Sequence, residues 1–343
     1  MLRLSSAKAA SRGAVQVGNS RAPAARSRSV LRAVLNGVLI PLAAATLLAQ
    51  SDEVPRFTSE SRLVVLHASV VDRKGKLLTD LPQNAFKVYE NGAEQNIKVF
   101  RREDVPVSIG MVIDNSGSMR DKRAKVERAS LDLVKASNPQ DEVFIVNFND
   151  EAYLDVEFTN DMRLLEMGIA RIDSRGGTAL RDSISMSMDY LREKGKKDKK
   201  VLLVITDGND TASNDRDTLE KLVDKAQKNE VLIFAVGLLS EEEPHEAKKA
   251  KRVLNSLTVA SGGLAYYPKE LTEVDEIALR VAHEIRNQYI IAYTPANPAL
   301  DGTFRQIHVT VKGPGAPIVR TRTGYYATAA GAKDARTASA RVP

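Results

Sequence analysis

The sequence predicts an α/β fold, in which a doubly wound, mostly parallel sheet is inserted into a small all-β, sandwich-like domain. Two observations support this prediction. Segments with strand and helix periodicity alternate between residues 105 and 287, which is typical of βαβ units. Segments with strand character also stand on both sides of that region. The later ones lack a core of their own, so we expect them to pair with the earlier ones.

The α/β region is recognised by its buried strands. Residues 107–114, VSIGMVID, form an apolar run that is too continuous for a half-exposed strand and suits the centre of a parallel sheet. VLLVIT and VLIFAVG, at 201–206 and 231–237, have the same character. Two more strands are predicted at 142–148 and 153–158. Helices are predicted at about 120–136, from 161, from 179, at 217–229 and at 273–287, with an extra, strongly charged helix within 240–261.

The β domain is predicted from two separate parts of the chain. Before the α/β region, residues 62–72 alternate as a strand does, and KVYE and NIKVFR around Asn91-Gly92 indicate a further pair of strands. After it come QYIIAYT, FRQIHVTVK and IVRTRTGYY, separated by turn signals such as Asn297-Pro298. We assign residues 57–104 and 288–327 to the β domain, 105–287 to the α/β domain and 328–343 to a disordered tail.

Residues 1–49 have the three parts of an export signal. A basic, acid-free start is followed by an apolar run from Ala33 to Leu48 and by small residues near its end. We expect cleavage after Ala49; because about 17 apolar residues just span a bilayer, an uncleaved anchor is the alternative. Either way, the body of the protein is expected in the periplasm, in the cell envelope or secreted. The absence of cysteine agrees with export and excludes thiolate metal sites.

The positive charge of the chain belongs to this leader. The chain carries a net charge of +6, but seven basic residues and no acidic one precede Asp52, so the remainder has a net charge of −1. A nearly neutral body lacks the general basic surface that binds phosphate groups. We therefore expect no nucleic-acid partner, and membrane contact only through an uncleaved anchor.

Oxygen-bearing side chains follow two of the buried strands, at the edge where doubly wound sheets bind their ligands. The first strand ends in DNSGS, which supplies the carboxylate of Asp114 and the hydroxyls of Ser116 and Ser118. The strand VLLVIT is followed directly by Asp207. Between them, GGT offers a flexible turn and the hydroxyl of Thr178 at a helix start. These five side chains are the predicted site.

Hard oxygen donors without cysteine or histidine indicate a site for Mg²⁺, with Mn²⁺ or Ca²⁺ as alternatives, rather than for zinc. Magnesium takes six oxygens at about 2.0–2.1 Å and usually retains several waters. Two carboxylates and neutral hydroxyls do not saturate the ion, which leaves a position for a carboxylate from another molecule. The expected partner is therefore a protein that presents a Glu or Asp side chain to the metal.

With DNSGS, the later GGTAL and TDG after a buried strand, the chain resembles the von Willebrand factor A domains and their metal-ion-dependent adhesion site. All five ligand positions match, and the resemblance covers about residues 105–287. It implies that Ser116, Ser118 and Thr178 bind the ion directly, and that Asp114 and Asp207 bind it directly or through water. It also implies adhesion or protein–protein interaction rather than catalysis. The flanking AFKVYENG, QYIIAYTP and RTRTGYYA resemble segments of bacterial exported proteins related to this family.

Three alternatives remain open. The hydroxyls of the site are also of the kind that cap helices, and Asp207-Gly208 is also a common turn. A structural envelope protein would keep the metal only as part of its scaffold. A Mg²⁺-dependent phosphate-ester hydrolase would use Asp114 as its nucleophile, but such enzymes generally need a second aspartate two residues later, where this chain has Ser116.

Weaker signals are interpreted as structural. His283-Glu284 begins like a zinc-protease HExxH motif, but the fifth position is Asn287, so the second histidine is missing. The acids Glu241-Glu242-Glu243 open the charged helix at its positive end, which needs no ligand. We expect exposed or structural positions for the remaining candidates: Asn209, Asp210 and Asp215 in an acidic turn, Lys194, Lys196, Lys197, Lys199 and Lys200 in a solvated loop, and His67, His245 and His308.

Overall fold

The computed structural model describes residues 62–170, 174–214, 216–328 and 333–334. All of these residues belong to one compact unit. The predicted leader, residues 1–49, lies outside the described residues, and so does most of the predicted tail. In the part of the chain that is described, no helix is long and apolar enough to cross a membrane.

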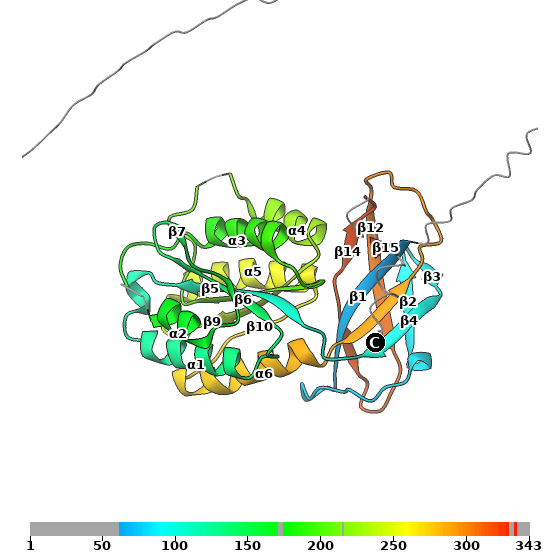
Figure 1. Ribbon diagram of the computed structural model, residues 1–343, viewed down its shortest axis with the longest axis horizontal. Coiled ribbons are helices and arrows are strands. Elements are labelled where there is room, and N and C mark those ends of the chain that lie inside the picture. The colour runs from blue at the N-terminus through cyan, green and yellow to red at the C-terminus, as the bar shows by residue number, and fades with distance from the viewer. Residues whose placement is uncertain (1–61, 171–173, 215, 329–332, 335–343) are drawn as a thin grey trace, which may run out of the picture. The chain divides into compact units, whose positions relative to one another are not determined.

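A six-stranded sheet forms the centre of the α/β region (Figure 1). Neighbouring strands run parallel except at one edge, where β7 runs antiparallel to β6. Every residue of the central strand β5 is buried, which explains its continuous apolar sequence. Across the sheet the order is β10 (Ala265–Tyr266), β9 (Val231–Gly237), β8 (Lys199–Thr206), β5 (Val107–Asp114), β6 (Glu142–Phe148) and β7 (Ala152–Thr159).

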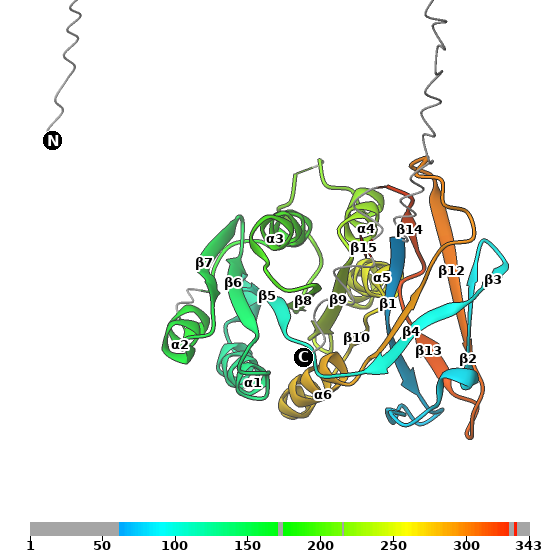
Figure 2. The same cartoon turned by 45° about the vertical axis from the view of Figure 1, so that its right-hand side comes forward.

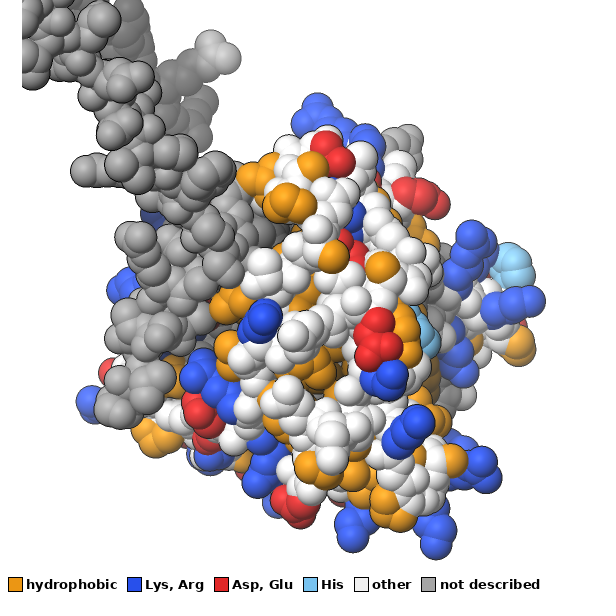
Figure 3. Space-filling view, turned by 90° about the vertical axis from the view of Figure 1, so that its right-hand side faces the viewer, with side chains coloured by type: hydrophobic (Ala, Val, Ile, Leu, Met, Phe, Trp, Pro, Cys, Tyr) orange, Lys and Arg blue, Asp and Glu red, His pale blue; other side chains and the backbone are white. Residues whose placement is uncertain are grey.

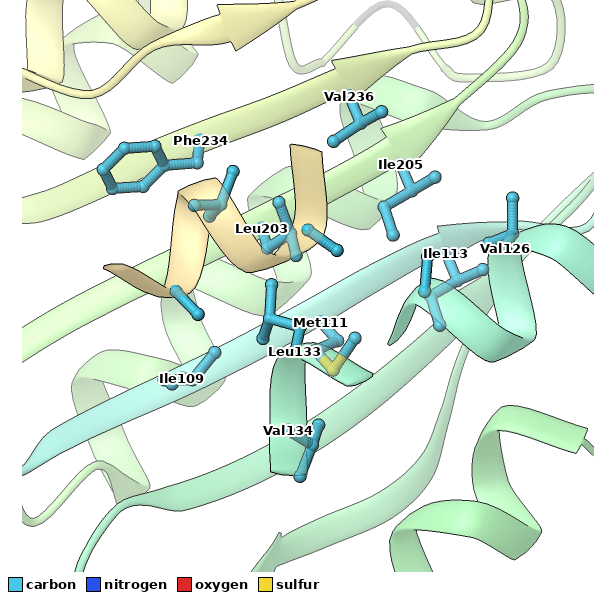
Figure 4. Packing of buried hydrophobic residues seen from close by; sticks show 14 of the residues in the cluster. Ile109, Met111, Ile113, Val126, Leu133, Val134, Leu203, Ile205, Phe234 and Val236 are labelled. Carbon is cyan, nitrogen blue, oxygen red and sulfur yellow. The ribbon is translucent and has the colours of Figure 1, made fainter. Parts of the chain in front are cut away.

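Helices cover both faces of this sheet. Ile109, Met111 and Ile113 of β5 pack with α1 (Figure 4), and the same hydrophobic cluster includes residues of α2 and α6. Val112 packs on the opposite face with α3, α4 and α5. The period of two along β5 divides its side chains between two hydrophobic clusters. The helices are α1 (Arg123–Lys135), α2 (Met162–Ala170), α3 (Leu180–Lys194), α4 (Leu219–Lys228), α5 (Pro244–Ser261) and α6 (Val274–Arg286). The predicted doubly wound fold is confirmed, and α5, which was predicted as an extra helix, is one of the helices that cover the sheet.

The segments before and after the α/β region pair with each other, as predicted (Figure 2). One sheet has the order β13 (Ile318–Arg320), β1 (Arg62–Val71), β11 (Tyr289–Tyr293), β4 (Ile97–Arg102), and the short β15 (Lys333–Asp334) also pairs with β1. The other has the order β14 (Gly324–Tyr326), β12 (Phe304–Val311), β2 (Phe86–Glu90), β3 (Ala93–Gln95). Apolar side chains of both sheets form a single cluster between them. The face over this sandwich shows acidic and basic side chains mixed with hydrophobic and uncharged ones (Figure 3).

A buried carboxylate holds the two sheets of the sandwich together. Glu90 of β2 accepts hydrogen bonds from the hydroxyl of Tyr293, 2.8 Å away in the opposite sheet, and from that of Tyr325, 3.0 Å away. Arg305 completes the group at 3.3 Å from Glu90 and is 2% exposed. Because each charge has a partner, the group avoids the cost of an isolated buried ion.

Two details of the sequence prediction are wrong. KVYE and NIKVFR do not pair: β2 turns at Asn91-Gly92, both with positive φ, and pairs with the short β3. NIKVFR becomes β4, which crosses to the other sheet and pairs with β11. IVRTRTGYY likewise divides into β13 and β14, one in each sheet. A short segment of alternating residues does not reveal which of two sheets it joins.

The basic run before β8 is only partly the solvated loop that we expected. Lys194 and Lys196 are exposed, but Lys199 lies within β8 and is 4% exposed. Its ammonium donates to the carbonyl of Ile285 at the end of α6. Burial lowers the pKa of Lys199 to about 7, against the opposing effect of nearby carboxylates.

Ion pairs join the sandwich to the α/β region. Arg322 contacts Glu230 at 2.8 Å, and Arg320 contacts the buried Glu284 of α6 at 3.2 Å. The hydroxyl of Tyr266 also donates to Glu284 at 2.9 Å. Glu284 is therefore a structural anchor, which agrees with our rejection of the HExxH interpretation.

Packing at the centre of the sheet generates the first prediction. A Cβ added at Gly110 would lie 2.3 Å from Cζ of Phe144 and 2.5 Å from Cδ2 of Leu202. Gly110→Ala should therefore lower the free energy of unfolding by about 1–3 kcal/mol, measured by urea denaturation. Gly208→Ala is the control, because its added Cβ has no neighbour within 4 Å. Equal losses in both variants would contradict the packing described.

Candidate metal centre

Three loops meet where β5 and β8 end. The first follows β5, the second precedes α3 and the third follows β8. Gly117 N donates to Gly176 O at 3.1 Å, and Arg175 N donates to Asn115 O at 3.1 Å. Thr211 N donates to the carbonyl of Thr178 at 2.9 Å, which joins the third loop to the second. All five predicted ligands lie on these connected loops, because parallel neighbouring strands end at the same edge.

Asp114 ends β5 and is 1% exposed. One carboxylate oxygen accepts from the backbone N–H of Ser116 at 2.8 Å, and the other accepts from the hydroxyl of Thr206 at 2.6 Å. Burial raises the pKa of Asp114 to about 6; the two hydrogen bonds oppose this rise, and the charge of Asp207 adds to it. A bound cation would stabilise the ionised form of this carboxyl group.

Ser116, Ser118 and Asp207 form a continuous hydrogen-bonded cluster. The two serine hydroxyl oxygens are 3.1 Å apart, and Ser118 donates to Oδ1 of Asp207 at 2.9 Å. Asp207 is fully buried and Ser116 nearly so, whereas Ser118 is exposed. Oxygen atoms that could bind a metal thus lie together at the ends of two neighbouring strands, and the Ser118 side chain is the one open to solvent.

Thr178 is connected to this cluster through the backbone. It is 5% exposed; its N–H donates to the hydroxyl of Thr211 at 2.9 Å, and its carbonyl accepts from Thr211 N and Ala212 N. Before it, Gly176 has a φ of +75°, and a Cβ there would lie 2.1 Å from the carboxylate of Asp150. Glycine is therefore required for the turn that brings Thr178 to the edge of the sheet.

A buried lysine was missed by the sequence analysis. Lys122 is 4% exposed, and its ammonium lies 2.8 Å from Oδ2 of Asp207 and 3.3 Å from Oε2 of Glu241. Burial lowers the pKa of Lys122, but the hydrogen bonds and charges of the two acids outweigh it, so the pKa is raised and the ammonium stays charged. The sequence contained one signal for it: Lys122 follows Ser118 by four residues, and residues at this spacing lie on the same face of a helix.

The donors at this edge fit a hard cation. They are carboxylate and hydroxyl oxygens, which are the ligands that hard cations prefer. The described residues contain no group of three or more His, Cys, Asp or Glu side chains placed to hold a metal ion, so the hydroxyls would have to complete the ligand set. Asp114 is buried without a basic partner within hydrogen-bonding distance among the described residues, whereas Asp207 is already paired with Lys122. A divalent ion would compensate the charge of Asp114 and compete with Lys122 for Asp207.

The capping alternative does not describe these hydroxyls. Ser116 precedes the 3-10 turn Gly117–Met119, but its side chain makes no capping hydrogen bond. The residue that caps α3 is Ala179 rather than Thr178, and it provides no side-chain cap either. The hydroxyl of Ser116 faces Ser118 instead.

The acidic turn after Asp207 differs from the expected exposed turn. The carboxylate of Asp210 is 7% exposed and lies 2.7 Å from Arg181. Asn209 donates to Glu246 of α5 at 2.8 Å. Asp215 lies outside the described residues. The two described polar side chains thus hold the loop against α3 and α5.

Part of the chain matches a known protein family. Residues 109–209 match the family described as von Willebrand factor type A domain. All five predicted ligands lie within the matched residues, although the match covers less than half of the chain. No curated protein gives a match to the sequence.

Several solved structures are similar to the protein. A von Willebrand factor type A protein from Catenulispora acidiphila has 13% identity and a TM-score of 0.47, covering 83% of this chain and 78% of that chain. The vWF domain of the type V pili tip protein Mfa5 from Porphyromonas gingivalis has 14% identity and a TM-score of 0.44, and the match covers 53% of this chain and 97% of that chain. Proximal thread matrix protein 1 from the mussel byssus, with a zinc-occupied MIDAS motif, has 17% identity and a TM-score of 0.44, and the match covers 57% of this chain and 50% of that chain. With all three TM-scores below 0.5, these similarities assign no function.

The buried Asp114 generates a prediction for the metal-free protein. Its pKa is raised from 3.8 to about 6, so folding favours the protonated form, and stability is lost as the pH rises through this interval. In EDTA at pH 7.5, Asp114→Asn should therefore be more stable than the wild type, by on the order of 3 kcal/mol. At pH 4 the difference between the two proteins should largely disappear. Thermal unfolding at both pH values measures this, and a pH-independent difference would contradict it.

Proposed function

We propose that this is an exported protein that binds one divalent cation, Mg²⁺ or alternatively Mn²⁺ or Ca²⁺, and uses it to bind a partner protein. Asp114, Ser116, Ser118, Thr178 and Asp207 would hold the ion, either directly or through water. The bound ion would supply a Lewis-acidic position that accepts a Glu or Asp carboxylate from the partner. The proposal assigns the chain to adhesion or protein–protein interaction rather than catalysis.

The main support is the arrangement of oxygen donors at the carboxyl edge of the sheet. Two buried carboxylates from neighbouring strands are linked through the hydroxyls and backbone of the DNSGS loop. The segment that contains them matches the von Willebrand factor type A domain. The basic, then apolar leader supports export, because signal peptides have this order.

The residues of this chain would hold the site in shape before the ion arrives. Thr206 orients Asp114 through its hydroxyl, and the N–H of Ser116 fixes the other oxygen of that carboxylate. Gly176 and Gly177 bring Thr178 to the edge, where Asp150 accepts from Gly177 N at 2.7 Å. Such prior ordering lowers the conformational entropy lost on binding.

Metal binding is tested by titrating Mg²⁺ and Mn²⁺ into the purified protein and following the heat of binding. We expect one site in the wild type and loss of at least tenfold in affinity in Asp114→Ala, because a buried anionic ligand is removed. Asp121→Ala is the matched control, since it removes an exposed carboxylate from the same loop. Equal affinity in the wild type and in Asp114→Ala would refute the site.

Partner binding is tested by capture from envelope and secreted material of the source cells, with and without EDTA. The proposal predicts proteins that are retained by the wild type in Mg²⁺, and released both by EDTA and by Asp114→Ala. Substituting an acidic residue of the captured partner should also release it. If every captured protein binds equally in EDTA, the metal serves the scaffold and not the interaction.

The catalytic alternative is tested on the same preparation. A phosphate-ester hydrolase would turn over a generic phosphate ester in Mg²⁺, and Asp114→Asn would abolish this activity. In this chain Ser116 stands where such enzymes have a second aspartate, and its hydroxyl shares a hydrogen bond of 3.1 Å with the hydroxyl of Ser118. We expect no turnover above that of Asp114→Asn.

A further inference from the structure

We propose that Lys122 is an internal counter-cation of the metal site, which pairs with Asp207 when the metal is absent and is left to Glu241 when the metal binds. The inference rests on the proposed metal binding at this site. It adds two residues, Lys122 and Glu241, that are outside the five predicted ligands and that set the affinity for the ion.

The first step is the burial of the pair. The side chain of Lys122 is 5% exposed and that of Asp207 is fully buried, with 2.8 Å between the ammonium and Oδ2. A carboxylate so far from solvent needs a compensating charge nearby. Since Asp207 is also a predicted ligand, the ammonium and a divalent ion would compete for the same carboxylate. Lys122 therefore stabilises the metal-free protein and opposes entry of the metal.

The second step is the presence of another acceptor for the ammonium. Glu241 stands in the loop between β9 and α5, with its carboxylate 3.3 Å from the ammonium of Lys122. Its side chain is 70% exposed, in contrast to that of Asp207. An ammonium group has three donors, so Lys122 contacts both acids at once. When a metal takes the charge of Asp207, Glu241 remains to compensate the lysine without a large movement.

The third step concerns the charge of the loaded site. Two ligand carboxylates balance a divalent ion, and Lys122 adds one further positive charge close to it. Glu241 offsets that charge from the solvent side. The two residues therefore have opposite effects on the metal: Lys122 weakens its binding, and Glu241 strengthens it by acting on Lys122. This dependence of one residue on the other distinguishes an ion-pair exchange from a general field of charges.

The test is a double-mutant cycle on the affinity for Mg²⁺. Lys122→Met should tighten binding by about tenfold, and Glu241→Gln should weaken it by about threefold, since nearby charges in partly buried sites act with these strengths. In the Lys122→Met background, Glu241→Gln should have almost no effect. Glu243→Gln is the matched control: it removes the same charge from the same loop, and within the described residues Glu243 forms no ion pair with Lys122. Its effect should be smaller and unchanged by Lys122→Met.

Thermal unfolding gives a second readout that does not depend on partner binding. Without metal, Lys122→Met should melt at a lower temperature than the wild type, because Asp207 loses its counter-charge. Saturating Mg²⁺ should raise its melting temperature by more than it raises that of the wild type. If Lys122→Met does not fold without metal, Glu241→Gln and Glu243→Gln are compared instead, because both residues are exposed. A larger loss of Mg²⁺ affinity in Glu241→Gln than in Glu243→Gln supports the pair, and equal losses refute it.

The outcomes separate this inference from the proposed function. If the wild type and Asp114→Ala bind Mg²⁺ equally, the metal site itself is wrong. If Asp114→Ala abolishes binding but Lys122→Met leaves the affinity unchanged or weaker, the site stands and the counter-cation is refuted. The same holds if Glu241→Gln keeps its full effect in the Lys122→Met background.

Discussion

The parallel pairing of β5 with β8 is the constraint on which the site depends. The two strands are in register from Val107 opposite Lys199 to Ile113 opposite Ile205. Their carboxyl ends therefore lie at the same edge, and Asp114 and Asp207 follow them as neighbours. Helices cover both faces, so the two carboxylates enter an environment from which water is largely excluded. The burial of both carboxylates is therefore a result of the helices that cover the sheet.

Burial makes the electrostatics of this edge costly, and the chain compensates each acid differently. Asp114 receives hydrogen bonds from Thr206 and Ser116, and its pKa is nevertheless raised. Asp207 receives a full positive charge from Lys122. The site is thus electrically asymmetric before any ligand is present. Asp114 has no basic partner among the described residues, whereas Asp207 is paired with the ammonium of Lys122.

Much of the fold was predictable because it depends on patterns that are local in the sequence. The continuous apolar run of β5 indicated burial on both faces, and the strand limits of β6 and β9 were predicted to the residue. The sheet joined by β4 was not predictable, because an alternating strand fits either sheet of a sandwich. The fate of Lys199 was also missed: a lysine suggests solvent, and only the packed α6 supplies the carbonyl that accepts from it.

The candidate site was predictable to the level of its loops and no further. The carboxylates and hydroxyls could be located because loops after parallel strands converge. The structure links four of the five predicted residues through side-chain and backbone hydrogen bonds. Their role as metal ligands stays a prediction. Lys122 and Thr206 were missed, and Glu241 was interpreted only as an acid at a helix start, because their roles arise from contacts between loops that are distant in sequence.

The α/β region is attached to the sandwich at two neighbouring positions of one strand ladder. The chain leaves the sandwich at the end of β4 and returns at the start of β11, and there Arg102 and Tyr289 are direct partners in adjacent antiparallel strands. The excursion between them begins and ends at nearly the same point, as a hairpin turn does. Lengthening such a turn costs little loop-closure entropy, even when a folded unit is added to it. The sandwich is therefore a frame in which an entire α/β unit occupies the place of a hairpin loop, and the strand ladder between β4 and β11 closes without a contribution from that unit.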